Sequence, residues 1–87
     1  MDEKTWYLYI LECRDGSLYT GITDDVPRRL AQHSAGKGAK YTRGRGPLIL
    51  RYQEAYGTHG DALRREIEVK RLTRQEKMNL ITQGAGH

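Results

Sequence analysis

Residues 5 to 22 read TWYLYILECRDGSLYTGI, and this stretch decides the fold. Two runs within it, residues 5–11 and 17–22, are rich in β-branched and aromatic side chains, as strands are. Between them lies Arg14-Asp15-Gly16, a sequence typical of a tight turn. The stretch therefore predicts a β-hairpin.

The two faces of the predicted hairpin differ in polarity. Side chains alternate along a strand, so Tyr7 and Tyr9 share one face. The other face carries Trp6, Leu8 and Ile10. Tyr19 joins the tyrosine face if the register places it opposite Tyr9 or diagonally beside it.

The rest of the chain predicts one more strand and helices. Residues 24–27, Asp-Asp-Val-Pro, resemble a capped helix start with proline in the first turn, and Gly36 ends that helix. Residues 48–55 predict a third strand. Thr58 and Thr73 each begin a capping-box pattern for a further helix. Together with the hairpin, these elements predict an α+β fold.

Length and composition limit the class of protein. The 87 residues predict a single domain over residues 1–87, with a core at about residues 5–82. The net charge of +4 suits a polyanionic partner. Cys13 is the only cysteine, which excludes an internal disulfide. There is no long apolar run, and acidic residues stand at the start, so we expect a cytoplasmic protein without membrane contact. We also expect a monomer or a weak homodimer.

Glu66 interrupts the apolar stripe of a predicted helix. The stripe is formed by Ala62, Leu63 and Val69. A carboxylate directed at a core costs several kcal/mol unless it is paired, hydrogen-bonded or bound to metal. Glu66 is thus a candidate metal ligand. The alternative is a structural ion pair with Arg65, Lys70 or Arg29.

The first predicted helix places two polar side chains on its inner side. Arg29 and His33 share that side with Val26 and Leu30, at offsets of three and four, while Arg28 points to solvent. Arg29 is therefore a candidate phosphate ligand. Its alternative role is that of a boundary residue whose stem packs and whose guanidinium reaches water.

Residues 36–46, GKGAKYTRGRG, predict a loop for nucleic acid. Glycines allow the backbone to approach a ligand closely, cations bind phosphates, and an aromatic ring can stack on a base. The candidate nucleic-acid-binding residues are Lys37, Lys40, Tyr41, Thr42, Arg43 and Arg45. The spacing matches no P-loop. The alternative is a mobile, solvated loop.

These polar groups converge if both helices pack on the tyrosine face, which we expect. One carboxylate suffices for Mg²⁺ or Mn²⁺, because water and substrate phosphate complete the coordination shell. A tyrosine has an ordinary pKa near 10, so it acts as a base at neutral pH only when positive charge, here from Arg29 or a metal, favours the phenolate. The combination suits hydrolysis of phosphodiesters.

At these positions the chain resembles the GIY-YIG nucleases, and most closely their small stand-alone bacterial members. Tyr7-Leu8-Tyr9 stands where the family has Gly-Ile-Tyr, and Tyr19-Thr20-Gly21 stands where it has Tyr-Ile-Gly. The segment from Gly21 through Arg29 to His33 resembles the helix with the family's active-site arginine. Ala62-Leu63 followed by Glu66 resembles its metal-binding motif.

The resemblance implies a three-stranded antiparallel sheet flanked by helices. It also implies that Tyr9 and Tyr19 position or activate the attacking water, that Arg29 stabilises charge on the phosphate, and that Glu66 holds the metal. His33 and Lys40 are expected helpers. Tyr7 departs from the family's glycine, and it either narrows the cleft or packs. The Gly-Ala-Lys loop is similar to that of structure-selective members, which suggests branched or repair DNA.

Three interpretations remain open on the sequence alone. The first is a metal-dependent endonuclease acting on DNA. The second is a nucleic-acid-binding module on a nuclease fold whose chemistry is weak or lost. The third is a small protein-interaction domain with a Tyr and Arg surface. Glu66 and Arg29 stand at their matched positions, which favours the first.

Overall fold

The structure is a computed structural model that describes residues 4–85. Its centre is a three-stranded antiparallel sheet in the order β2-β1-β3. The strands are β1 (Trp6–Glu12), β2 (Leu18–Thr23) and β3 (Ile49–Tyr56). Gly16 closes the hairpin turn with φ +84, a left-handed conformation that favours glycine. The predicted α+β fold is confirmed.

Three helices and one short 3-10 turn accompany the sheet within residues 4–85. They are α1 (Val26–Ser34), η1 (Lys40–Thr42), α2 (His59–Lys70) and α3 (Arg74–Ala85). Asp25 and Thr58 cap α1 and α2, accepting backbone N–H bonds at 3.0 and 3.1 Å. Thr73 and Glu76 form the predicted capping box of α3, with bonds of 2.8 and 3.1 Å. In the part of the chain described, no helix has the length and apolar character needed to span a membrane.

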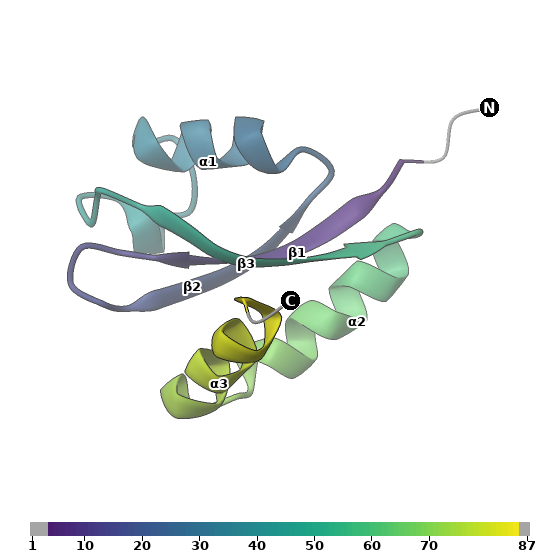
Figure 1. Cartoon of the computed structure of the whole chain (residues 1–87). Coiled ribbons are helices and arrows are strands. Elements are labelled where there is room, and N and C mark those ends of the chain that lie inside the picture. The colour runs from purple at the N-terminus through teal and green to yellow at the C-terminus, as the bar shows by residue number, and fades with distance from the viewer. Residues whose placement is uncertain (1–3, 86–87) are drawn as a thin grey trace.

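The helices cover both faces of the sheet. Figure 1 shows α1 on one side and α2 with α3 on the other. The expectation that both functional helices pack on the tyrosine face is therefore wrong. The reason is that Leu8 and Ile10, on the opposite face, are also completely buried, and they form the core together with Val69 of α2 and Ile81 of α3. Each apolar face of the sheet needs its own cover.

Helix α2 is also rotated from the expected position. Ala62 and Val69 are completely buried, but Leu63 is 40% exposed. Glu66 consequently lies at the flank of the buried stripe and not at its centre, with a side chain that is 15% exposed. The helix contacts all three strands.

Thr20 leads to a prediction about stability. It is 3% exposed on β2, and its hydroxyl has no hydrogen-bond partner among residues 4–85. Replacing a buried, unpaired hydroxyl by a methyl group removes a desolvation cost, so Thr20→Val should stabilise the fold by about 1 kcal/mol in urea unfolding. The control is Thr23→Val. Thr23 is 7% exposed, and its hydroxyl accepts the Asp25 N–H at 3.1 Å, so this change should destabilise. Equal effects of the two substitutions would contradict the assignment.

Candidate active site

Tyr9 lies at the centre of the site, on the α1 side of the sheet. It is 2% exposed, and it pairs with Gly21 on the neighbouring strand. Its ring lies across that glycine: a Cβ atom at position 21 would stand 2.6 Å from the phenol oxygen. The glycine of the Tyr19-Thr20-Gly21 motif is therefore required by the packing of Tyr9.

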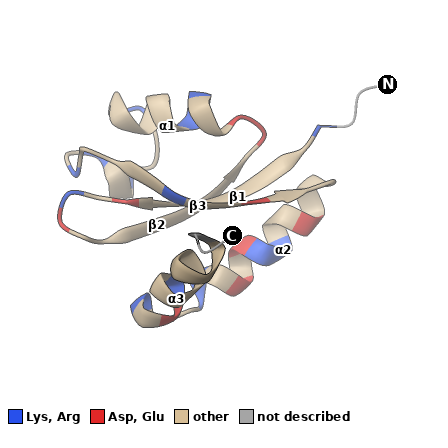
Figure 2. Ribbon diagram, in the orientation of Figure 1, with Lys and Arg blue, Asp and Glu red and all other residues tan. Residues whose placement is uncertain are grey.

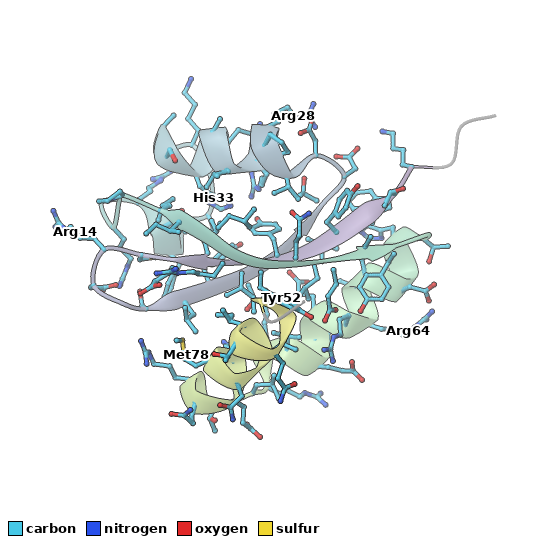
Figure 3. The ribbon with its side chains drawn as sticks, viewed as in Figure 1. Arg14, Arg28, His33, Tyr52, Arg64 and Met78 are labelled. Carbon is cyan, nitrogen blue, oxygen red and sulfur yellow. The ribbon has the colours of Figure 1, made fainter. Side chains whose placement is uncertain are left out.

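His33 of α1 is hydrogen-bonded to Tyr9. Its Nε2 lies 2.9 Å from the phenol oxygen, and the side chain is buried, with 1% exposure. In Figure 3, His33 points from α1 toward the sheet, whereas Arg28 points away from it. These are the orientations that the helical spacing predicted.

The loop between α1 and β3 closes over the other side of the His33 ring. The Thr42 hydroxyl lies 2.9 Å from Nδ1 and donates to the carbonyl of Ala39 at 2.9 Å, while the Ala39 N–H lies 3.3 Å from the same nitrogen. Nδ1 cannot accept the Ala39 N–H and also carry a hydrogen, so the three contacts cannot all be hydrogen bonds in one tautomer. Because Thr42 has one hydroxyl hydrogen, a hydrogen on Nδ1 satisfies its two 2.9 Å contacts and gives up only the longer contact to Ala39. We therefore assign Nε2 as the acceptor of the Tyr9 hydroxyl.

Thr42 and Gly38 differ from their expected roles. Thr42 is 2% exposed, so its side chain is not available to nucleic acid; it holds His33 instead. A Cβ atom at Gly38 would lie 2.2 Å from His33 Nδ1, so this glycine allows the loop to approach the histidine. Sequence reasoning missed both contacts. The small residues of the Gly-Lys-Gly-Ala segment were the signal that could have indicated close packing.

A chain of aromatic ring contacts runs from the site to the surface. The Tyr19 ring lies 5.2 Å from His33 and 5.9 Å from Tyr41, measured between ring centroids. The Arg45 guanidinium lies 4.6 Å from the Tyr41 centroid, in a cation–π contact, and its Nη1 is 2.6 Å from the Asp15 carboxylate. Tyr41 is 43% exposed. Arg45 is thus engaged by the protein, whereas the Tyr41 ring offers an accessible surface.

The other cations of the loop are exposed. Lys37, Lys40 and Arg43 all project into solvent. In Figure 2, blue segments occur in this loop and at the hairpin turn, at the same end of the molecule. Their contact with nucleic acid remains a prediction.

Arg29 lies beside Tyr9 and His33. It is half-buried, and its Nη1 donates to Gln32 at 3.0 Å. Burial, and next the charge of Arg29, lower the pKa of His33 below its ordinary value. His33 is therefore neutral at pH 7, so one of its ring nitrogens can accept the Tyr9 hydroxyl.

The Tyr9 phenol is not ionised at neutral pH. Burial raises its pKa to about 12, and the opposing contribution of Arg29 is smaller. The charges of Tyr19 and Glu66 raise it further, which places Glu66 within electrostatic range of the phenol. Arg29 favours the phenolate, as expected, but its contribution does not outweigh the effect of burial. His33, which is hydrogen-bonded to the phenol, is placed to take its proton.

Glu66 suits a hard divalent cation. Its Oε2 lies 3.3 Å from Nζ of Lys70, an exposed residue of the same helix, so the ion-pair alternative is also realised. A pair with an exposed lysine is weak, and a cation can displace it. Within residues 4–85, no group of three or more His, Cys, Asp or Glu side chains could hold a metal. A site with one carboxylate suits Mg²⁺, because water and substrate phosphate serve as its other ligands. The same site does not suit zinc, which is bound by three or four protein side chains.

Tyr7 lines a different hollow from Tyr9. A groove of about 490 Å³ lies between α1 and β3, and its walls include Tyr7, Pro27, Leu30 and Gln53. On the helical wheel, Leu30 and Arg29 project from opposite flanks of α1. The groove therefore occupies the β3 side and the catalytic candidates the β2 side, so the residue at position 7 does not narrow the catalytic cleft.

The buried neutral histidine predicts a loss of stability in acid. Below about pH 6.5 His33 becomes protonated in the unfolded chain, whereas its lowered pKa keeps it neutral in the folded protein. The free energy of unfolding should therefore fall as the pH is lowered toward 5. The slope cannot exceed about 1.4 kcal/mol per pH unit. Urea unfolding of His33→Gln should lose this slope, whereas His59→Gln, at an exposed position, should keep it. A pH-independent wild type between 6.5 and 5 would contradict the prediction.

Sequence comparisons point to one family. The model of the GIY-YIG catalytic domain matches residues 5–79. The UPF0213 protein BH0048 of Halalkalibacterium halodurans is 54% identical over 80 residues, which cover 92% of this chain and 85% of the relative. The UPF0213 protein SH2523 of Staphylococcus haemolyticus is 52% identical over 75 residues, covering 86% and 92%. These names state no activity.

Solved structures agree with the sequence comparisons. The solution NMR structure of the UPF0213 protein BH0048 from Bacillus halodurans is 53% identical, with a TM-score of 0.60 over 91% of this chain and 84% of that one. The solution NMR structure of EF2693 from E. faecalis is 39% identical, with a TM-score of 0.64 over 99% and 93%. The resemblance to this family is therefore confirmed, and the chain belongs to the GIY-YIG family.

Proposed function

We propose that the protein is a metal-dependent endonuclease that hydrolyses phosphodiester bonds in DNA, in structured or repair DNA in particular, and that it works in the cytoplasm. The observation that carries the proposal is the buried hydrogen-bond chain from Tyr9 through His33 to Thr42. A chain of this kind has a direct use in moving a proton. A binding module without chemistry would not need a neutral histidine behind a tyrosine.

The proton of the attacking water passes through Tyr9. The phenol oxygen accepts it while the phenol hydrogen moves to His33 Nε2, so no free phenolate forms. The charge that develops on the imidazole is held by the Nδ1–H bond to Thr42. The water oxygen bonds to phosphorus, the bond from phosphorus to the leaving oxygen breaks, and the leaving oxygen takes a proton from solvent.

Arg29, Tyr19 and Glu66 act on the phosphate side of this reaction. Arg29 stands beside the phenol, where a guanidinium can bind a phosphate oxygen. Tyr19, in edge-to-face contact with His33, orients the water. Glu66 would hold Mg²⁺ or Mn²⁺, which supplies stabilisation of negative charge on the phosphate.

A cleavage panel tests the proposal. End-labelled duplex, nicked, branched and single-stranded DNA, with matched RNA, are incubated with the protein in Mg²⁺, in Mn²⁺ and in EDTA. We expect cuts with either metal and none in EDTA, with branched or nicked DNA cut faster than plain duplex. Products that are identical in EDTA, or a panel left uncut under every condition, would overturn the proposal.

The exposed cations of the loop predict that the affinity for DNA depends on salt concentration. Replacing Lys37, Lys40 and Arg43 together by alanine should flatten the plot of log binding constant against log salt by about 0.7 to 0.9 per lost phosphate contact. Arg64→Ala is the control. Arg64 is exposed on α2, where it pairs with Asp61 and points away from the sheet in Figure 3. An unchanged slope in the triple variant would exclude the loop from binding.

A further inference from the structure

The carboxylate of Glu54 on β3 accepts four hydrogen bonds. Its Oε1 accepts the Tyr56 hydroxyl at 2.5 Å and Arg65 Nε at 2.9 Å. Its Oε2 accepts the Tyr52 hydroxyl and Arg65 Nη2, the latter at 3.1 Å. The carboxylate is 18% exposed, and the Arg65 side chain is 29% exposed. We call these four residues, Tyr52, Glu54, Tyr56 and Arg65, the Glu54 clasp.

The clasp is stiff. The two phenols come from the same strand and fix the plane of the carboxylate, and the planar guanidinium meets both oxygens at once. Burial works to raise the pKa of Glu54, but the bonds from Arg65, Tyr52 and Tyr56 hold it below its ordinary value. Burial, and then the bond to Glu54, raise the pKa of each phenol to about 12, so both remain donors. Arg65 is therefore held in one orientation.

The buried apolar face of α2 is narrow. Its buried residues are Ala62 and Val69, which are small. Leu63 is 40% exposed and Ile67 is 46% exposed, on the flank away from Arg65. Rolling the helix toward these two side chains would bury apolar surface, which the hydrophobic effect favours, and would turn Glu66, which lies between Val69 and Leu63, further toward the core. Arg65 lies on the opposite flank, where its bonds to Glu54 oppose that roll.

We propose that the Glu54 clasp sets the roll of α2 and thereby holds Glu66 toward Tyr9, which makes Glu54 and Arg65 positioning residues of the active site. Glu66 follows Arg65 directly, about 100° further around the helix. A roll of about 20° would move a side chain at the helix surface by about 2 Å, and misplacement by about 1 Å can lower a rate 100-fold. The link to catalysis rests on the proposed function, whereas the roll itself does not.

The roll is tested by NMR on the full chain without DNA. A neutral gadolinium chelate relaxes exposed methyl groups, so Leu63 and Ile67 should be strongly relaxed in the wild type. In Glu54→Gln we expect their relaxation to fall at least about twofold, because α2 rolls to bury them. Glu12→Gln is the matched control: it breaks the bond from Arg51 Nε to Glu12, 2.6 Å long, on the same sheet but away from α2. It should leave both methyl groups unchanged.

The placement of Glu66 is tested by Mn²⁺ titration of the same samples, following the broadening of amide signals around residue 66. Glu54→Gln should need about tenfold more Mn²⁺ than the wild type, and Glu66→Gln should lose the specific broadening. If Glu54→Gln does not fold, Arg65→Lys and Tyr56→Phe replace it, with smaller shifts in the same direction expected. Unchanged methyl relaxation in folded clasp variants overturns the proposal, even if their stability falls. If the wild type shows no Mn²⁺ broadening, the metal role of Glu66 is overturned. The proposed roll of α2 is then judged from the methyl relaxation alone.

Discussion

Gly21→Ala should abolish most of the cleavage activity and destabilise the fold. The added methyl would lie 2.6 Å from the Tyr9 oxygen and 2.7 Å from the ring carbon that bears it. Tyr9 is 2% exposed and bonded to His33, so it has no free space to enter. We expect a loss of about 1 to 3 kcal/mol in urea unfolding. The displaced phenol should lower single-turnover cleavage at least about 100-fold.

Gly60→Ala is the matched control for this experiment. Gly60 lies in the first turn of α2, and a Cβ atom there would meet nothing within 4 Å. Alanine is the better helix former, so the change should be neutral or stabilise by up to about 1 kcal/mol. Activity should not change. A Gly21→Ala protein as active as the Gly60→Ala protein would show that the position of Tyr9 does not matter.

Glu66→Gln should remove metal-dependent cleavage while the protein stays folded. Glutamine keeps the shape of the side chain but lacks the charge that binds a divalent cation. The metal supplies several kcal/mol of charge stabilisation, so single-turnover cleavage in Mg²⁺ should fall at least about 1,000-fold. The free energy of unfolding should change little, by about 0.5 kcal/mol, because the lost partner is the exposed Lys70 of the same helix.

Glu68→Gln tests whether any carboxylate of α2 would do. The Glu68 side chain is 68% exposed, and it faces Arg65 at 3.3 Å. Its replacement should leave both the cleavage rate and the dependence on Mg²⁺ as in the wild type. Equal losses in the two variants would mean that the charge of α2 as a whole, and not the Glu66 site, supports cleavage.

The features that the sequence predicted well are local. The hairpin depends on the Arg14-Asp15-Gly16 turn and on alternation within each strand, and the helix starts depend on caps that act three residues away. The inward side of α1 followed from helical spacing, which brought His33 to Tyr9. Each of these signals lies within a few residues of its effect.

The features that the sequence did not predict depend on contacts between distant segments. Both faces of β1 are apolar, so alternation could not tell which helix covers which face, and α2 was placed on the wrong one. Thr42 lies nine residues from His33 in the sequence, and no local pattern indicates a contact at that separation. The prediction that Thr42 binds nucleic acid therefore missed its contact with His33. The Glu54 clasp left one trace, a carboxylate between Tyr52 and Tyr56 on the same side of a strand.

The central claim is that Tyr9 and His33 activate water to attack a phosphodiester, and isotope transfer from water tests it most directly. The protein cuts a DNA oligonucleotide in Mg²⁺ and H₂¹⁸O, and mass spectrometry weighs the fragments. The account predicts one ¹⁸O atom in the new terminal phosphate of each cut, with no product in EDTA and almost none from His33→Ala. Terminal phosphates without ¹⁸O, or no cleavage by the wild type, would contradict it.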